Sequence, residues 1–253
     1  MTAPLLDVRG LSKRFAGLVA NDDVHLQVWA GEVHALIGPN GAGKTTLVSQ
    51  LAGQLASDHG SVHFDGHDIS ALNAHQRAQR GLVRSFQITR LFKSFSVLDH
   101  VALALQAVSG SSLRAWRPMW KESALFDRAQ ALLAEVGLQA KAGFGVDQLS
   151  HGERRALEVG MALASRPKLV LLDEPMAGMG PDESARMEQL IQALRARSTV
   201  VLIEHDVDAV FRLADRVSVL VGGRIVASGA PDAVRRDPEV MSAYLGDGSG
   251  AAT

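Results

Sequence analysis

Three short runs of apolar residues stand out along the chain, at residues 33–38, 168–175 and 198–206. Each run is rich in β-branched residues and bounded by turn residues, and its apolar character on both faces is typical of buried parallel strands. Helical patterns lie between and after these runs, at residues 44–55, 125–136, 152–164, 182–197 and 207–214. This alternation predicts an α/β fold whose mostly parallel sheet is covered by helices on both faces.

The two ends of the chain show a different pattern. Residues 5–28 alternate apolar and polar positions around the turn AGLVAND, and the strand pattern at 61–69 is broken by Asp65-Gly66. Residues 217–229 place Gly222-Gly223 between two strand-like halves, which is a strong hairpin signal. Together these pieces predict an antiparallel sheet packed beside the parallel one. The tail at about 230–247 predicts short helices opened by proline and aspartate.

Composition narrows the possible classes of protein. A chain of 253 residues is long enough for one large domain, which we take as residues 1–253. The chain has 26 basic and 27 acidic residues, so its net charge would not attract the phosphates of nucleic acid. No nucleic-acid partner is therefore expected. The absence of cysteine excludes disulfides and thiol catalysis. No secretory signal is evident, and no apolar run reaches the ~20 residues of a membrane helix, so membrane association is expected through partners.

The sequence GPNGAGKTT at residues 38–46 matches a phosphate-binding loop between a predicted strand and a predicted helix. Glycines allow backbone amides to turn inward around a β-phosphate at the positive end of the helix. The lysine reaches the β- and γ-phosphates, and the first threonine offers its hydroxyl to Mg²⁺. The predicted nucleotide-binding residues are Gly38, Pro39, Asn40, Gly41, Ala42, Gly43, Lys44, Thr45 and Thr46.

The run LVLLDEP carries two acidic residues to the carboxyl end of a buried strand, where open parallel sheets bind ligands. Asp173 is predicted to hold Mg²⁺ through water, and Glu174 is predicted to polarise an attacking water. A buried carboxylate pair can also serve as a structural ion-pair partner. The phosphate loop in the same chain favours the functional interpretation.

With the phosphate loop, LSHGE at 149–153 and LLDEP in this order, the chain resembles the ATPase subunits of ABC transporters. The resemblance implies a P-loop NTPase fold of ABC ATPase type. Such a fold has a mostly parallel RecA-like sheet, an antiparallel β subdomain and a helical signature subdomain, here at about 88–165. In the family the signature LSGGQ contacts the γ-phosphate of ATP held by another subunit, which implies this role for Ser150 and Gly152.

The signature departs from the family sequence at two positions. His151 replaces a glycine, and we treat it as a surface residue without a catalytic role. Glu153 replaces a glutamine, and its carboxylate is expected to repel a phosphate mildly unless Arg154 or Arg155 offsets its charge. The serine hydroxyl and the glycine backbone of the motif are retained.

Further positions carry over from the family one at a time. Phe15 matches the aromatic residue that stacks on adenine, although a lone aromatic is more often part of a core. Gln87, in RSFQ, matches the glutamine that approaches Mg²⁺ and the attacking water. His205 matches the switch histidine that contacts the γ-phosphate and orients the catalytic water, although a histidine at a strand end is more often structural. The loop MAGMGP at 176–181 stands where the family has residues that touch the opposite subunit.

Longer segments resemble the ATPases of branched-chain amino-acid importers, the LivG-type branch, and of related amide and urea importers. The segments that carry this resemblance are KRFAGLVANDDV, RSFQITRLFKSFSVLDHV, LSHGERRALEVGMALA, LLDEPMAGMGP and DPEVMSAYLG. The resemblance implies ATP and Mg²⁺ as cofactors. The implied partners are two transmembrane permease subunits, a second ATPase subunit that is a copy or a paralogue in a head-to-tail dimer, and, indirectly, a periplasmic solute-binding protein. The implied location is the cytoplasmic face of the inner membrane.

Several alternatives stay open on the sequence alone. The ATPases of lipopolysaccharide and lipid export have comparable motifs, and a soluble ABC ATPase or a non-ABC P-loop regulator are weaker rivals. Leu91, Phe92 and Phe95 fall where the family receives a coupling helix of the membrane subunit, or they pack into the helical subdomain. Trp116 and Trp120 lie in an insertion that either contacts lipid headgroups or, as we favour, packs as an ordinary loop.

Overall fold

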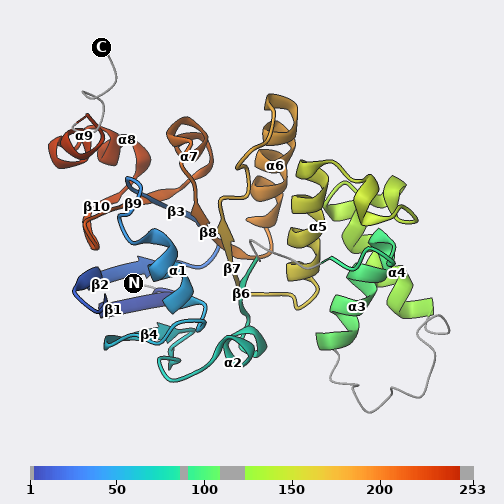
Figure 1. Ribbon diagram of the computed structural model, residues 1–253, viewed down its shortest axis with the longest axis horizontal. Helices are drawn as coiled ribbons and strands as arrows, with labels where there is room; N and C mark the ends of the chain where they lie inside the picture. The colour runs from blue at the N-terminus through green and yellow to red at the C-terminus, as the bar shows by residue number, and fades with distance from the viewer. Residues whose placement is uncertain (1–2, 86–90, 109–122, 246–253) are drawn as a thin grey trace.

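The computed structural model describes residues 3–85, 91–108 and 123–245, whose strands form two sheets. A four-stranded sheet has the order β2-β1-β4-β5, and a six-stranded sheet has the order β10-β9-β3-β8-β7-β6. In Figure 1 the four-stranded sheet lies at the lower left, and helix α1 (Lys44–Leu51) lies between it and the larger sheet. Both the mostly parallel sheet and the additional antiparallel sheet agree with the fold class predicted from the sequence.

The six-stranded sheet contains all three of the apolar runs. They form β3 (Val33–Ile37), β7 (Leu169–Asp173) and β8 (Thr199–Ile203), which are buried along their whole length. Each of these strands runs parallel to its neighbours, so their carboxyl ends meet at one edge of the sheet. The short strand β6 (Leu82–Arg84) extends the sheet by pairing in parallel with β7.

The hairpin at Gly222-Gly223 forms as expected but joins the other sheet. Its strands β9 (Arg216–Val221) and β10 (Arg224–Gly229) pair antiparallel with each other, while β9 runs parallel to β3. The expectation that this hairpin belongs to the antiparallel sheet was therefore wrong. The physical reason is the apolar run in β9, which is buried through four consecutive residues and suits the interior of the larger sheet.

The antiparallel sheet consists of β1 (Leu6–Phe15), β2 (Leu18–Val28), β4 (His59–Phe64) and β5 (His67–Asp68). β4 and β5 meet at the Asp65-Gly66 turn that the sequence indicated. Alternate residues of β1 and β2 are buried against α1, which brings its apolar side chains between the two sheets. The phosphate-loop region at the start of α1 is thereby fixed from both sides.

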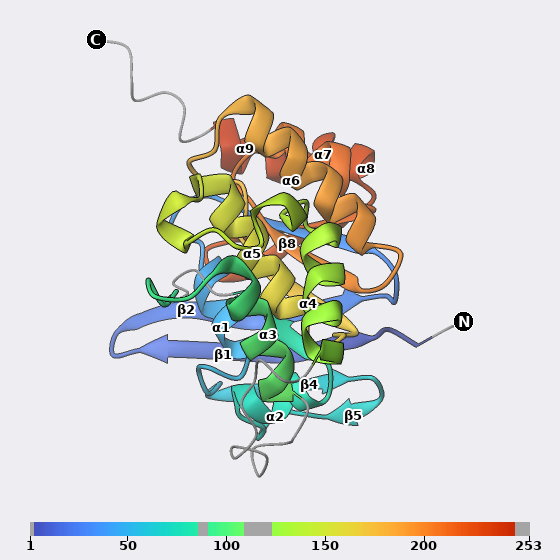
Figure 2. The same cartoon turned by 90° about the vertical axis from the view of Figure 1, so that its right-hand side faces the viewer.

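A layer of helices covers the opposite face of the larger sheet. It contains α3 (Val97–Val108), α4 (Ser123–Glu135), α5 (His151–Leu163) and α6 (Pro181–Leu194), with short 3₁₀ turns at Gln139–Lys141 and Val146–Gln148. Val170 and Leu172 of β7 point into this layer, whereas Leu169 and Leu171 point toward α1. Figure 2 looks onto α3, α4 and α5, which stand together away from the four-stranded sheet.

The remaining helices pack against the part of the larger sheet formed by β3 and β9. α7 (Val207–Leu213), α8 (Pro231–Arg235) and α9 (Pro238–Leu245) follow β8 and β10, and a small core joins them to Val217 and Val219. α8 and α9 begin at prolines, as the tail pattern predicted. The short helix α2 (Ala74–Gln79) precedes β6. Among the described residues, no helix combines the length and the apolar character needed to cross a membrane.

Candidate functional site

The phosphate loop connects β3 to α1, and at two of its glycines a β-carbon would collide with neighbouring backbone. Gly43 has a φ of +102°, and a β-carbon there would lie 2.1 Å from the carbonyl oxygen of Ala20. A β-carbon at Gly38 would lie 2.0 Å from the carbonyl oxygen of Leu220. Gly41 also has a positive φ, of +78°, but nothing stands near its missing side chain. The loop is therefore packed against two distant segments and open on one side.

Lys44 stands at the first position of α1 and is only 6% exposed. Its Nζ donates hydrogen bonds to the carbonyl oxygens of Gly38 (2.6 Å) and Pro39 (2.9 Å) of the same loop. Burial lowers the pKa of this amine, although the nearby carboxylates of Glu174 and Asp173 act in the opposite direction. The structure thus brings the predicted phosphate-binding lysine and both acidic residues into one electrostatic cluster.

Asp173 ends β7 and is 3% exposed. Its Oδ2 accepts a charge-assisted hydrogen bond from Arg84 on β6, while Oδ1 is buried without a hydrogen-bond partner among the described residues. Arg84 also donates to the hydroxyl of Ser49 (3.1 Å). The structural interpretation of Asp173 as an ion-pair partner therefore holds in part, and one carboxylate oxygen stays available. Sequence reasoning missed Arg84, although it is the first residue of the segment RSFQ that drew attention to Gln87.

Glu174 and His205 come from adjacent strands and contact each other. The backbone amide of Glu174 donates to the carbonyl of Ile203 at 2.9 Å, and the residue has a left-handed φ of +49°. Glu174 Oε1 lies 2.7 Å from Nε2 of His205, which follows β8. Strained backbone of this kind is often found where a side chain must be aimed at a site. The structure places the predicted base and the predicted switch histidine side by side.

Glu204 is a buried residue that the sequence reasoning missed. It is 4% exposed, and its carboxylate accepts hydrogen bonds from the backbone amides of Met176 (2.8 Å) and His205 (3.2 Å). Burial raises the pKa of this carboxyl group. Glu204 therefore joins the start of loop 176–181 to the residue that contacts Glu174. The available signal was a charged residue within the end of an apolar strand, in IEHD.

The signature residues lie at the start of α5, in a second cluster. Ser150 caps the helix: its Oγ accepts from the amide of Glu153 (3.3 Å), and Glu153 Oε2 accepts from the amide of Ser150 (3.0 Å). The charge of Glu153 is offset by Lys141, at 2.7 Å, and not by Arg154 or Arg155 as the sequence suggested. Arg154 donates to the carbonyl of Val146, and Arg155 pairs with Glu158. The lysine that neutralises Glu153 comes from the 3₁₀ turn at Gln139–Lys141.

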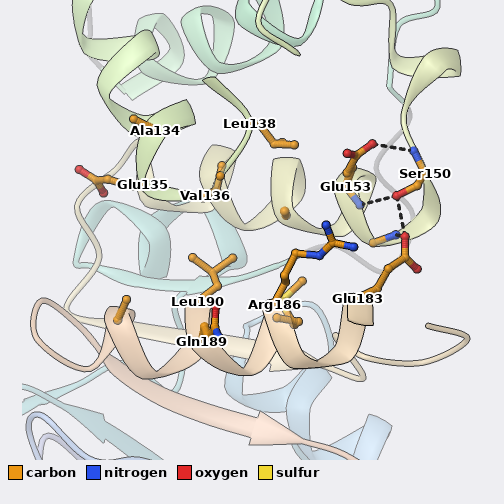
Figure 3. Close-up of a pocket in the computed structure, with 15 residues that line it drawn as sticks. Ala134, Glu135, Val136, Leu138, Ser150, Glu153, Glu183, Arg186, Gln189 and Leu190 are labelled. Atoms are coloured by element: carbon orange, nitrogen blue, oxygen red, sulfur yellow. Dashed lines mark hydrogen bonds between the residues drawn. The ribbon is translucent and has the colours of Figure 1, made fainter. Parts of the chain in front are cut away.

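A carboxylate from α6 also reaches this cluster. Oε1 of Glu183 accepts from the hydroxyl of Ser150 (2.6 Å) and from the amide of Gly152 (3.3 Å). Figure 3 shows Glu183 pointing at Ser150 from the N-terminal end of α6. Beside this contact, a cavity of about 410 Å³ lies between α6, α5 and the end of α4. His151 is exposed and lies 3.1 Å from the carbonyl of Ala177, in the loop after Glu174.

The other predicted residues fall at the surface or outside the described residues. Phe15, at the end of β1, is 46% exposed with the ammonium of Lys13 5.6 Å from its ring centroid, so its adenine-stacking role stays a prediction. Phe92 is 53% exposed, and its ring lies 5.2 Å from that of Phe95. Gln87 and both tryptophans of the insertion at 116 and 120 lie outside the described residues.

A phosphate loop after one parallel strand, with an acidic pair two strands along in the sheet, is the arrangement of a P-loop nucleotide triphosphatase. The ABC transporter family profile matches residues 21–177, and a profile of branched-chain amino acid ATP-binding cassette transporters matches residues 224–249. The chain belongs to the ABC transporter family as an ATP-binding subunit, and it is an ATPase.

Several relatives share the full length of this chain. The branched-chain amino acid transport ATP-binding protein LivG of Escherichia coli K12 is 36% identical, covering 98% of this chain and 100% of LivG. The branched-chain amino acid transport ATP-binding protein BraF of Pseudomonas aeruginosa is 37% identical, covering 98% of this chain and 100% of BraF. The lipopolysaccharide export ATP-binding protein LptB of Acidithiobacillus ferridurans is 37% identical, covering 96% of this chain and 97% of LptB.

Solved structures agree with the fold. The ADP conformation of MJ1267, an ATP-binding cassette of an ABC transporter, superposes with a TM-score of 0.87 at 31% identity, covering 97% of this chain and 100% of that one. A nucleotide-free ATP-binding cassette from an ABC transporter gives a TM-score of 0.85 at 29% identity, covering 95% and 98%. The ABC ATPase fold predicted from the motifs is confirmed.

Proposed function

We propose that this chain is the ATPase subunit of a membrane importer for branched-chain amino acids or related amino acids and amides. The observation that carries the proposal is the match of residues 224–249 to the branched-chain transporter profile, because that segment lies outside the shared ATPase motifs. It includes β10, α8 and α9. The similarity to LptB makes lipopolysaccharide or lipid export the second candidate.

The residues present fit a magnesium ion bound together with nucleotide. Asp173 Oδ1 is a buried carboxylate oxygen with no hydrogen-bond partner among the described residues, and the exposed Thr45 is the second residue of α1. Oxygen ligands from one hydroxyl and one carboxylate, completed by phosphates and water, are what Mg²⁺ prefers. The ion would neutralise charge that develops on the phosphates during transfer.

Hydrolysis then depends on positioning by this chain's own residues. The loop amides and the Lys44 ammonium hold the phosphates. To do so, the lysine gives up its hydrogen bonds to the loop carbonyls and donates to phosphate oxygens instead. Glu174 accepts the proton of the attacking water, and its 2.7 Å contact with His205 fixes the orientation of both side chains. The resemblance adds Gln87 as a further water-orienting residue.

The proposal includes a head-to-tail dimer with a second ATPase subunit, either a copy or a paralogue. In such a dimer Ser150 and Gly152 contact the nucleotide bound to the other subunit. Permease subunits would dock near Phe92, whose exposed ring supports an interface there because large aromatic side chains are enriched at such surfaces. Docking on two permeases would hold the chain at the cytoplasmic face of the inner membrane and link it indirectly to a periplasmic solute-binding protein.

The first test is the Glu174→Gln substitution. Removing the carboxylate that accepts the proton is expected to lower turnover by about 10²- to 10⁴-fold while ATP binding persists. Release of phosphate and binding of a fluorescent ATP analogue measure the two effects separately. Glu239→Gln, on α9, is the matched control and should keep normal turnover. Rapid hydrolysis by the Glu174 variant would remove this residue from the mechanism.

The second test separates import from export. The Glu174→Gln chain is tagged in its host, membranes are solubilised with ATP and Mg²⁺, and the co-purifying chains are identified with their ratios. Two different multi-span permeases with a distinct second ATPase support the amino-acid importer. A homodimer with export-type membrane proteins supports the second candidate, and recovery without any membrane protein contradicts transport altogether.

A further inference from the structure

The two signature groups that would meet a phosphate are both bonded within this chain. The hydroxyl of Ser150 and the amide of Gly152 donate to the same atom, Oε1 of Glu183, at 2.6 and 3.3 Å. Glu183 stands in the first turn of α6, on a different element from the signature helix α5. Figure 3 shows this carboxylate directed at the start of α5. A negatively charged oxygen therefore occupies the anion-binding end of the signature helix.

The helix does not need Glu183 as its cap. Ser150 and Glu153 already form a reciprocal capping box, which satisfies one free amide of α5 and the amide of the cap residue. The amide of Gly152 is a further donor of the first turn that has no acceptor within the helix, and helix N-termini attract anions at such donors. The position that Glu183 fills is thus one that would suit a phosphate oxygen equally well.

The donors cannot serve two acceptors at full strength. A hydroxyl and a backbone amide each carry one hydrogen, so a bond to Glu183 and a bond to a phosphate oxygen compete. A β-carbon at Gly152 would lie 2.9 Å from Cδ of Glu183, which shows how closely the carboxylate approaches the backbone. A phosphate cannot contact the same amide while the carboxylate remains there.

We propose that Glu183 is an internal competitor for the phosphate of the partner subunit's nucleotide, and that its displacement from Ser150 and Gly152 sets the affinity of ATP-dependent dimerisation. The inference rests on the proposed function, since it requires the nucleotide-sandwich dimer. Glu183 is a positioning residue in this scheme, and the ligand it imitates is an anionic phosphate oxygen.

The surroundings of Glu183 allow it to leave. Its side chain is partly exposed, and the cavity of about 410 Å³ adjoins it, so rotation away from α5 displaces no core side chain. Arg186 lies one turn further along α6 and lines the same cavity. Residues three apart on a helix can pair, so Arg186 offers the released carboxylate an alternative partner.

Two-state arithmetic gives the size of the expected effect. When only a fraction of molecules has a free signature, the apparent dissociation constant exceeds the intrinsic one by the inverse of that fraction. If the contact is closed in roughly 70–90% of molecules, freeing one signature contributes about three- to tenfold, and freeing both signatures of a two-copy dimer tightens dimerisation by about ten- to a hundredfold. A residue that only supports the fold would change the affinity in the opposite direction.

The experiment compares dimerisation of Glu174→Gln chains with and without Glu183→Ala, by analytical ultracentrifugation in MgATP. The expected result is a dimer about ten- to a hundredfold tighter with Glu183→Ala, because both signatures are freed. Asp182→Asn, which removes a charge from the same turn without touching Ser150, should leave the affinity unchanged. In a Ser150→Ala background, Glu183→Ala should give a smaller gain, because one of the two contested donors is absent.

The outcomes separate this inference from the function on which it rests. If the parent Glu174→Gln chain shows no ATP-dependent association, the proposed sandwich of two copies fails, and the inference fails with it. If the parent associates but Glu183→Ala associates equally or more weakly, only the role of Glu183 is overturned. Hydrogen exchange provides a second readout: without nucleotide, the Gly152 amide should exchange faster in Glu183→Ala, and equal exchange would contradict the contact.

Discussion

The phosphate loop and the signature end of α5 both present backbone amides that suit an anion, yet the chain builds them differently. The phosphate loop is fixed by backbone packing, with Gly38 and Gly43 pressed against the carbonyls of Leu220 and Ala20. The signature end is held by a side chain, Glu183, which contacts Ser150 and Gly152 through a single oxygen. Backbone packing can be altered only by disturbing the fold, whereas a carboxylate can rotate away.

This difference assigns different tasks to the two regions. A loop enclosed by neighbouring strands is preorganised, so nucleotide binding requires little more than movement of Lys44 from its carbonyl acceptors. A signature that is occupied by a carboxylate gives affinity only after that carboxylate is displaced. The chain is therefore expected to bind nucleotide readily as a monomer and to dimerise under control.

Among the substitutions that test this comparison, Lys44→Ala has the largest expected effect. Loss of the ammonium that meets the phosphates should lower turnover by about 10²- to 10³-fold and weaken ATP binding. Stability should not fall, because burial already lowers the pKa of this amine and its charge is costly to bury. Calorimetric titration with ATP and urea unfolding measure the two effects. Lys168→Ala, which breaks a surface ion pair with Asp65, is the control and should bind ATP normally.

A pair of glycine substitutions tests whether packing builds the phosphate loop. Gly43→Ala should destabilise the chain by roughly 2–3 kcal/mol and abolish ATP binding, because its β-carbon collides with a backbone carbonyl. Gly41→Ala places its β-carbon in open space and should cost only about 1 kcal/mol, for its positive φ. Thermal unfolding and ATP titration measure both variants. Equal losses would show that φ alone, and not packing, determines the loop.

The smallest expected effect concerns Glu204 and the pH. Burial raises the pKa of this carboxyl above its ordinary value of 4.5, so the native state binds a proton more readily than the unfolded state. Its contribution to stability is present below 4.5 and is lost as the pH rises through the folded pKa. Relative to Glu204→Gln, the wild-type chain should therefore lose stability between acid and neutral pH.

Urea unfolding of both chains at several pH values measures this loss, and parallel curves would contradict it. The turnover of Glu204→Gln gives a second readout. Its KM for ATP should stay near the wild-type value while kcat falls, because Glu204 holds the loop after Glu174 and the amide of His205 but not the nucleotide.

The sequence predicted those parts of the site that depend on local pattern. The phosphate loop follows one apolar strand and Asp173 ends another, and parallel pairing of β3, β8 and β7 brings the strand ends to one edge. His205 was predicted from the family resemblance, because a histidine at a strand end is by itself more often structural. Contacts between residues distant in sequence were missed. Glu183, Glu204 and Arg84 find their partners only after the helices and strands pack, and no spacing along the chain indicates such pairs.

The misplaced hairpin has the same origin. Alternation and a glycine pair predict that β9 and β10 pair with each other, but they do not say which sheet receives them. The decisive feature was the run of four buried residues in β9, three of them apolar, which is covered on both faces beside β3. Lys141 offsets Glu153 for a comparable reason, because the turn that carries it packs against the start of α5.

The hairpin also affects the order in which the chain becomes competent during synthesis. The amide of Gly223 donates to the carbonyl of Ala42, and the amide of Asp22 donates to the carbonyl of Gly223, both at 2.9 Å. The nucleotide loop leaves the ribosome early, whereas its support is among the last parts of the sheet to be made. A nascent chain that ends before Gly223 lacks this support. A truncated chain of this kind is therefore expected to bind ATP more weakly than the full chain.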